Sequence, residues 1–180
     1  MDSLRGQLLI SGARLLDPNF RHTVVLIGEH NPDSALGVIL NRPLSLTVEE
    51  TVPLLAGLVP SGERIFQGGP VQPQQPVLLA EFAYAGLADL PVFGSVGFLT
   101  GDVPAEVQPG ILRARVFAGY AGWGAGQLEA ELEIGSWIVG KATEDDVFSS
   151  APESLWRRIL ERMGPPYAAL ARVPFDPRTN

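Results

Sequence analysis

The sequence predicts a single α+β domain, and three observations point to that fold class. The chain has 180 residues, a length that fits one domain with one substantial core. Apolar runs of strand length recur along it and are separated by turn-forming residues. Two segments carry the spacing of a helix-capping box, in which a hydroxyl residue precedes an acidic residue by three positions.

The expected strands are short and begin near the N-terminus. Residues 23–27 and 37–40 are apolar runs of buried-strand length, and Asn31-Pro32-Asp33-Ser34 between them is a turn signal. We expect these two runs to pair as an antiparallel hairpin. The other expected strands cover residues 7–10, 64–67, 76–82, 92–99, 111–118 and 136–141.

Two helices are expected, at residues 47–57 and 151–163, and a short one follows Thr143. The capping boxes that open the two longer helices are Thr47 with Glu50 and Ser150 with Glu153. The sequence Gly164-Pro165-Pro166 ends the second helix. We assign residues 1–171 to the domain and residues 172–180 to a polar C-terminal tail.

A glycine-rich segment, Gly119-Tyr120-Ala121-Gly122-Trp123-Gly124-Ala125-Gly126-Gln127-Leu128-Glu129, is the most specific feature of the chain. Glycine loses more conformational freedom on folding than other residues, so four glycines in eight positions indicate special backbone dihedrals or a close approach of two chains. We therefore expect Gly119 and Gly122 to be present for backbone reasons. This segment resembles the signature of the AlgH/YqgE family of bacterial proteins.

Four further segments agree with that family in content and order. They are residues 17–31, 37–43, 66–71 and 152–156. The resemblance implies a mixed, largely antiparallel sheet curled towards a barrel, with helices packed outside. The family is mostly uncharacterised, and a regulatory role has been proposed for it.

The composition of the chain argues against several classes of binding partner and chemistry. The formal net charge is −7 and Lys141 is the only lysine, so the basic footprint of a DNA-binding domain is missing. We expect no direct nucleic-acid binding, with duplex DNA bound no tighter than ~0.1 mM. The absence of cysteine excludes disulfides and thiolate catalysis. No apolar run approaches the ~18 residues of a membrane helix, and we expect a cytoplasmic protein without a signal peptide or membrane contact.

The expected hairpin separates two groups of candidate residues. If His30 lies opposite Ala35, then Val24 lies opposite Asn41, and the two levels are about 20 Å apart. Glu29 and His30 would then occupy one end of the hairpin and Arg42 the other. Successive strand residues point to opposite faces, so Glu29 and His30 would not act together.

The histidines give no metal site. His22 and His30 would lie about 26 Å apart along one strand, too far to share an ion. We therefore expect no metal and no cofactor.

Two interpretations of Arg42 remain open. In the first, Arg42 pairs with Asp17 across a turn and Asn41 caps a strand end. In the second, Arg42 is an anion clamp in a ligand pocket.

The two glycine motifs differ in their claim to bind phosphate. Gly68-Gly69-Pro70 is followed by Pro73, which favours an extended turn over a phosphate loop that opens a helix. The segment that ends at Gln127 can open a helix, but it lacks the lysine of a phosphate loop. It is either a strand-to-helix corner in which Tyr120 and Trp123 fill the core, or a ligand site.

No nucleophile, base and orienting group fall in one local unit, so we assign no catalytic residue. We favour a non-enzymatic module that binds a small molecule or a protein, with an indirect regulatory role. The candidate ligand-binding residues are Glu29, His30, Asn41, Arg42, Gly68, Gly69, Tyr120, Trp123 and Gln127. One alternative is a hydrolase or transferase for an anionic substrate, with Glu29 or His30 as base and Arg42 as binder. The other is an interaction or scaffold protein whose motifs serve folding only.

Overall fold

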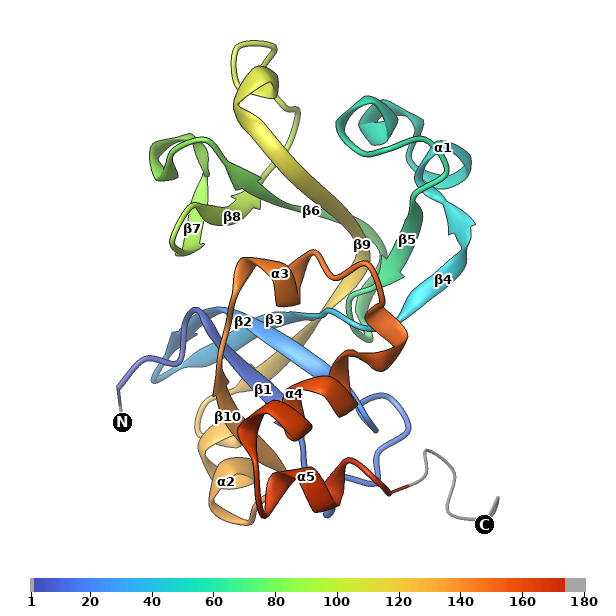
Figure 1. The fold of residues 1–180 in the computed structure, drawn as a ribbon. Coiled ribbons are helices and arrows are strands. Elements are labelled where there is room, and N and C mark those ends of the chain that lie inside the picture. The colour runs from blue at the N-terminus through green and yellow to red at the C-terminus, as the bar shows by residue number, and fades with distance from the viewer. Residues whose placement is uncertain (1, 174–180) are drawn as a thin grey trace.

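The computed structural model describes residues 2–173, which form one bent sheet of ten strands with helices around it (Figure 1). The strands are β1 (Gln7–Ser11), β2 (Val24–Asn31), β3 (Ser34–Ile39), β4 (Pro43–Thr47), β5 (Arg64–Gln67), β6 (Val71–Phe82), β7 (Leu90–Phe93), β8 (Val96–Leu99), β9 (Ile111–Gly124) and β10 (Trp137–Lys141). The α-helices are α1 (Val48–Thr51), α2 (Gln127–Glu133), α3 (Glu144–Val147), α4 (Leu155–Met163) and α5 (Tyr167–Leu170). The 3-10 helices are η1 (Pro53–Leu58), η2 (Ala85–Leu87), η3 (Gln108–Gly110) and η4 (Pro152–Ser154).

Strand order divides the sheet into two halves that share β9. The order is β10-β1-β2-β3-β9-β6-β8-β7, with β4 and β5 attached beside β9. We call β10-β1-β2-β3 the first half-sheet and β6-β8-β7 the second half-sheet. β5 runs parallel to β9, and the other pairs are antiparallel. The predicted α+β class with a mixed, largely antiparallel sheet is confirmed, and the sheet bends without closing into a barrel.

The middle of β1 and the first half of β2 are apolar throughout because both faces of the sheet are covered there. Leu8 and Ile10 face the core cluster that contains Leu155 of α4, whereas Leu9 faces the cluster that contains Leu128 of α2. A strand that is buried on both faces reads as a continuous apolar run, without the alternation of a half-exposed strand. Trp156 of α4 donates its indole N–H to the carbonyl of Ser11 and fixes the helix to β1.

A third core cluster lies in the other part of the fold. It joins β5, β6, β8 and the first part of β9 to α1 and η1. β9 connects the halves, since its residues 111–118 pair with β6 and its residues 121–124 pair with β3. The long strand is seen to run through both parts of the molecule in Figure 1.

The predicted β2–β3 hairpin forms, but its register changes within the hairpin. His30 pairs with Ala35 as expected, whereas Val25 pairs with Ile39, so Val24 does not lie opposite Asn41. The cause is a bulge at Gly28, which adds one residue to β2. Glycine fits there, because a Cβ would lie 2.6 Å from the ring of Phe98 and the ring would have to shift.

The helix predicted at residues 47–57 divides into α1 and η1. The capping box of Thr47 and Glu50 is present, with both of its hydrogen bonds formed. Pro53 lacks the N–H that would continue the α-helix, and the chain goes on as a 3-10 helix.

The helix predicted at residues 151–163 begins with the 3-10 turn η4 and continues as α4. This turn moves the helix N-cap to Ser154, and neither start carries a side-chain cap bond, so the capping box predicted for Ser150 and Glu153 is wrong. Glu153 forms an ion pair with Arg64 instead. The helix ends at Gly164, which has a positive φ of 77°.

Several elements differ from the sequence-based expectation. Residues 92–99 form the hairpin of β7 and β8, which turns at Gly94, rather than one strand. The glycine-rich segment continues β9 to Gly124 and does not form a corner until Gly126. β4 and α5 were not expected. The helix predicted after Thr143 is α3, with Thr143 as its N-cap.

The proposed boundary at residue 171 stays a prediction, because residues 174–180 lie outside the described residues. Among the helices of residues 2–173, none is both long and apolar enough to cross a membrane.

Candidate functional site

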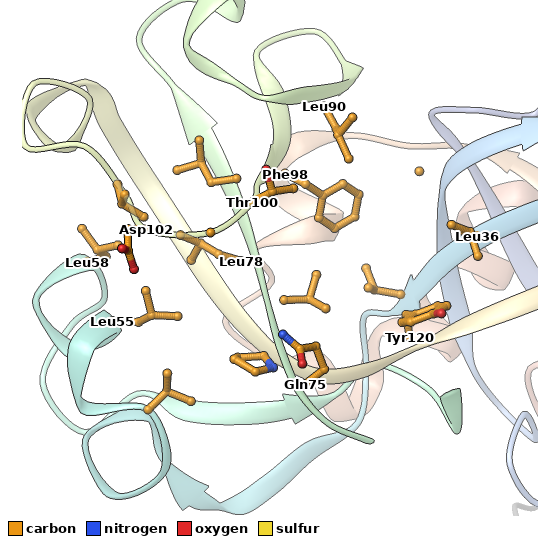
Figure 2. A pocket seen from close by; sticks show the side chains of 18 of the residues that line it. Leu36, Leu55, Leu58, Gln75, Leu78, Leu90, Phe98, Thr100, Asp102 and Tyr120 are labelled. Carbon is orange, nitrogen blue, oxygen red and sulfur yellow. The ribbon is translucent and has the colours of Figure 1, made fainter. Parts of the chain in front are cut away.

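An apolar pocket of about 840 Å³ lies beside β6, where the second half-sheet meets β3 (Figure 2). Its wall combines residues from β2, β3, β6, β7, β8 and β9 with the 3-10 helix η1. The labelled apolar residues that line it are Leu36, Leu55, Leu58, Leu78, Leu90, Phe98 and Tyr120. Ligand sites in proteins are typically cavities of this size, lined by apolar side chains with a few polar groups.

Local backbone breaks build this pocket. Pro53 ends α1, and the following 3-10 helix brings Leu55 and Leu58 to one side of the pocket. The bulge at Gly28 leaves room for the ring of Phe98, which lines another part of the wall. β6 lies between them, and its burial changes along its length from exposed residues at its start to buried residues from Leu78 onward.

Polar side chains occur around the pocket in small number. They are Arg5, Glu29, Gln75, Thr100, Asp102 and Gln108. Glu29 and Asp102 are exposed carboxylates, and Arg5 is the one cationic residue in the described lining. The backbone N–H of Thr100 donates to the carboxylate of Asp89, which holds the end of β8. This arrangement can bind apolar surface and select among ligands by charge at its mouth.

The glycine motifs meet in one backbone crossing. The amide of Gly68 donates to the carbonyl of Ala118, and the carbonyl of Gly68 accepts from the amide of Ile39. A Cβ at Gly68 would lie 2.2 Å from the carbonyl oxygen of Gly119, and a Cβ at Gly119 would lie 2.6 Å from that of Gly69. Gly119 also has a positive φ of 75°. These glycines are therefore needed for two chain segments to pass in contact.

Tyr120 and Trp123 point to opposite faces of β9, because they are three positions apart on a strand. Tyr120 lines the pocket. Trp123 is buried in the second core cluster, and its indole N–H donates to a carboxylate oxygen of Glu131 at 2.7 Å. Trp137 donates to the same oxygen at 3.0 Å. Phe20 packs against both indole rings, at centroid distances of 6.2 and 5.7 Å.

Gln127 is the first residue of α2, directly after the turn that follows β9. Its side-chain carbonyl accepts from the amide of Gly124 at 3.0 Å. The hydrogen bond satisfies a backbone donor just before α2, and Gln127 is not among the pocket residues.

His30 points away from Glu29, as the alternation of a strand requires, and its side chain is 4% exposed. Its Nδ1 accepts from the backbone N–H of Leu4 at 2.9 Å, so the ring proton is on Nε2, which donates to Glu129 at 2.7 Å. This bond from His30 lowers the pKa of the Glu129 carboxyl. His30 therefore joins the N-terminal segment to α2, whereas Glu29 remains at the pocket.

The Arg42 side chain holds the loop before β2 by bonding to the backbone carbonyls of that loop. Its guanidinium donates to the carbonyls of Pro18, Asn19 and Arg21 and does not bond the carboxylate of Asp17. Burial lowers the pKa of Arg42, an effect that the nearby Asp17 opposes.

Asn41 secures the same region from the end of β3. Its side-chain amide donates to the carbonyl of His22, and its side-chain carbonyl accepts from the amide of Val24. Asn41 therefore caps a strand end, as one of the two interpretations expects.

The structure thus distributes the candidate residues over separate places. Glu29 and Tyr120 lie at the pocket, and Gly68 and Gly69 lie behind it in the crossing. His30, Asn41, Arg42, Trp123 and Gln127 bond to other parts of the chain, as described above. Within residues 2–173, no three His, Asp or Glu side chains form a group that could hold a metal ion.

Most of the pocket wall was not anticipated from the sequence. Leu55, Leu58, Leu78 and Phe98 look like ordinary core residues in a linear pattern. One signal was present, since adjacent leucines at 54 and 55 follow a proline. Successive residues of a 3-10 helix lie about 120° apart, so Leu54 and Leu55 point in different directions, and Leu54 is 93% exposed.

Comparison with known proteins places this geometry in a family. The AlgH-like family model matches residues 8–168. The chain belongs to the AlgH-like family. A relative in the family, a UPF0301 protein of Streptomyces coelicolor, is 39% identical over 187 residues, covering 100% of this chain and 97% of the relative. A UPF0301 protein of Thermobifida fusca is 40% identical over 190 residues, covering 99% of this chain and 96% of the relative.

Solved structures from the same comparison agree in fold. The crystal structure of a protein from Corynebacterium diphtheriae has a TM-score of 0.86 at 26% identity, covering 95% of this chain and 93% of that chain. The solution structure of the AlgH protein from Pseudomonas aeruginosa has a TM-score of 0.68 at 28% identity, covering 96% of each chain.

Proposed function

We propose that this protein is a non-enzymatic binding module whose ligand site is the apolar pocket beside β6. The observation that carries the proposal is the pocket itself: about 840 Å³, lined mainly by apolar residues from six strands and η1. Apolar surface left open to water at this scale is typical of a binding site, because a packed core would otherwise have filled it.

The arrangement of the polar residues supports binding rather than catalysis. A general base must reach a substrate proton, yet the Nδ1 of His30 already accepts from Leu4. Arg42, the anion binder of the enzymatic alternative, is committed to three backbone carbonyls. Glu29, at the pocket, therefore has neither His30 nor Arg42 beside it to form a catalytic set.

A regulatory role, if exercised through this pocket, would be indirect. With a net charge of −7, the chain lacks the positive surface that supplies most non-specific affinity for DNA. We therefore propose that a bound molecule or protein mediates any effect on gene expression, in the cytoplasm.

Nile red, an uncharged dye that fluoresces in apolar surroundings, tests the proposal. The wild-type chain should bind it, and Leu55→Asp should weaken binding at least about tenfold by placing a charge in the pocket. Leu132→Asp is the matched control, because Leu132 is also a half-buried leucine but packs against the second core cluster. Equal dye binding by wild type and Leu55→Asp, with both proteins folded, would refute the proposed site.

A further inference from the structure

Two leucines at the mouth of the pocket are far more exposed than its wall. Leu54 of η1 is 93% exposed and Leu90 of β7 is 53% exposed, and both belong to the pocket lining. They come from elements at different ends of the pocket, since Leu55 and Leu58 of η1 lie at one end in Figure 2 and Leu90 at another. A small ligand on the floor would leave these leucines in water. An occupant that covers both must extend beyond the pocket.

The charged residues of the described pocket lining are two carboxylates, one at each end, and the single cation Arg5, so the lining is negative on balance. Asp102 lies beside Leu58 at one end (Figure 2), and Glu29 pairs in register with Leu36 at the other. The chain as a whole carries a net charge of −7. A positively charged partner would be attracted to this surface, and a negatively charged one would be repelled.

Whether the partner can bind as an added strand depends on which strands at the pocket have a free edge. β3 is paired with β2 and β9, and β8 is paired with β6 and β7, so neither can accept an added strand. β7 is an edge of the sheet, but Pro91 removes one of its backbone donors. Residues 71–77 of β6 pair with β9 alone, but Pro73 and Pro76 remove two backbone donors from that stretch. Recognition therefore relies mainly on side chains, which is how an amphipathic helix binds a groove.

We propose that the pocket receives the apolar face of a cationic amphipathic helix from another protein. The inference rests on the proposed function, because it takes the same pocket as the binding site. Apolar anchors at positions i, i+3 or i+4 and i+7 of the helix would occupy the space between η1 and β8. Lysines or arginines towards its two ends would face Asp102 and Glu29.

A second copy of this chain does not fit that description. Its cationic helix is α4, which carries Arg157, Arg158 and Arg162. The apolar residues of α4, including Leu155 and Ile159, are buried in its own core. Two copies would also repel each other, since each has a net charge of −7.

Synthetic peptides on the full-length chain provide the test. The probe is a fluorescently labelled peptide of about 18 residues, about 27 Å long as a helix, with leucines at the anchor positions and lysines elsewhere. One comparison peptide replaces the lysines by glutamates, and another keeps the composition but scrambles the leucine spacing. By fluorescence anisotropy, we expect the cationic helix to bind at least about tenfold more tightly than either comparison peptide.

Substitutions at the mouth of the pocket test whether the peptide binds there. Leu54→Ser and Asp102→Lys should each weaken binding of the cationic peptide about tenfold. The matched controls are Leu112→Ser and Glu133→Lys, which change an exposed leucine and an exposed glutamate outside the pocket and should leave the affinity unchanged.

The outcomes are separable. Equal binding of all three peptides, or no effect of the mouth variants, overturns the helix proposal. If Nile red binds in the pocket but no peptide does, the pocket is a ligand site and the partner class is wrong. If neither binds, the proposed function fails as well. Dimerisation that Leu54→Ser abolishes would identify a second copy as the occupant and overturn the proposal.

Discussion

The two half-sheets differ in how their faces are covered. In the first half-sheet, α4 packs on one face and α2 on the other, and β1 is buried from Leu8 to Ser11. In the second, β6 begins with seven exposed or half-buried residues before its buried stretch, and the nearby cover is the short 3-10 helix η1. A complete helix fills the space above a sheet, whereas a six-residue 3-10 helix leaves part of it open. The pocket therefore lies where the cover is incomplete.

The largest loss of stability is expected from a substitution on the buried face of β9, and it can be compared with a substitution on the pocket face. Trp123→Ala should lower the free energy of unfolding by ~3–5 kcal/mol, because it removes a buried ring and leaves Glu131 without one of its donors. Tyr120→Ala, on the pocket face, should cost less stability and affect Nile red binding more. Urea unfolding and dye titration of both variants measure the contrast. A larger stability loss for Tyr120→Ala would contradict the assignment of the faces.

The glycines of β9 give a matched pair for the backbone crossing. Gly119→Ala should destabilise by at least ~1–3 kcal/mol, because the residue has a positive φ and its Cβ would contact two backbone carbonyls. Gly122→Ala should have little effect, since its Cβ would meet only side chains at 3.6 Å or more. The sequence-based expectation grouped the two glycines together, and the structure separates them. Thermal unfolding of the two variants decides the matter, and equal losses would refute the crossing.

Substitutions of Arg42 should change the stability of the first half-sheet and leave binding at the second half-sheet unchanged. Arg42→Ala should lower stability by ~1–3 kcal/mol through the loss of its bonds to loop carbonyls. Arg42→Lys should recover only part of it, because lysine lacks the planar fork. Nile red binding should be unchanged in both. Unchanged stability with lost uptake of an anionic ligand would restore the anion-clamp interpretation.

The smallest effect is expected in the stability of the protein at acidic pH. The pKa of Glu129 is lowered in the folded chain by its bond from His30, so this contribution is present above the unfolded value of about 4.3 and is lost as pH falls through the folded value. Glu129→Gln should therefore flatten the decline of the melting temperature on the acidic side of about pH 5. Glu133→Gln serves as the control on the same helix. An identical acid profile for wild type and Glu129→Gln would exclude a role for this bond.

The fold was more predictable than the site, for reasons visible in single residues. The runs at residues 23–27 and 37–40 are apolar throughout because both faces of these strands are buried, and such runs predict strands well. The register shift at Gly28 was missed, because the residue that packs against this bulge, Phe98, lies seventy positions away and no local pattern reveals it. For Trp123 the sequence left a core residue and a ligand-binding residue as alternatives, and the structure buries the ring with its indole N–H donating to Glu131.

The pocket depends on how far η1 and β7 stand apart, and this distance is a property of the whole sheet. Leu78 would look the same in the linear sequence whether a helix covered it or not. The signature residues attracted attention because glycines and polar groups in turns are conspicuous. Several of them serve the backbone instead: Arg42 bonds to loop carbonyls, and Gly68 allows two chain segments to pass in contact. In a sequence, residues with such structural roles look the same as residues that bind a ligand.

The pairing of β1 with β10 has a consequence for the order in which the chain can fold. β1 is made first during synthesis and β2 follows soon after, but its other neighbour, β10, arrives about 130 positions later, and Trp156 reaches Ser11 from 145 positions away. Closing such long loops is entropically slow. While the ribosome is still translating, β1 and β2 must expose apolar faces that α4 will later cover. We therefore expect the nascent chain to depend on chaperones until its last fifth has emerged, and a truncation before α4 to aggregate rather than to leave a smaller folded protein.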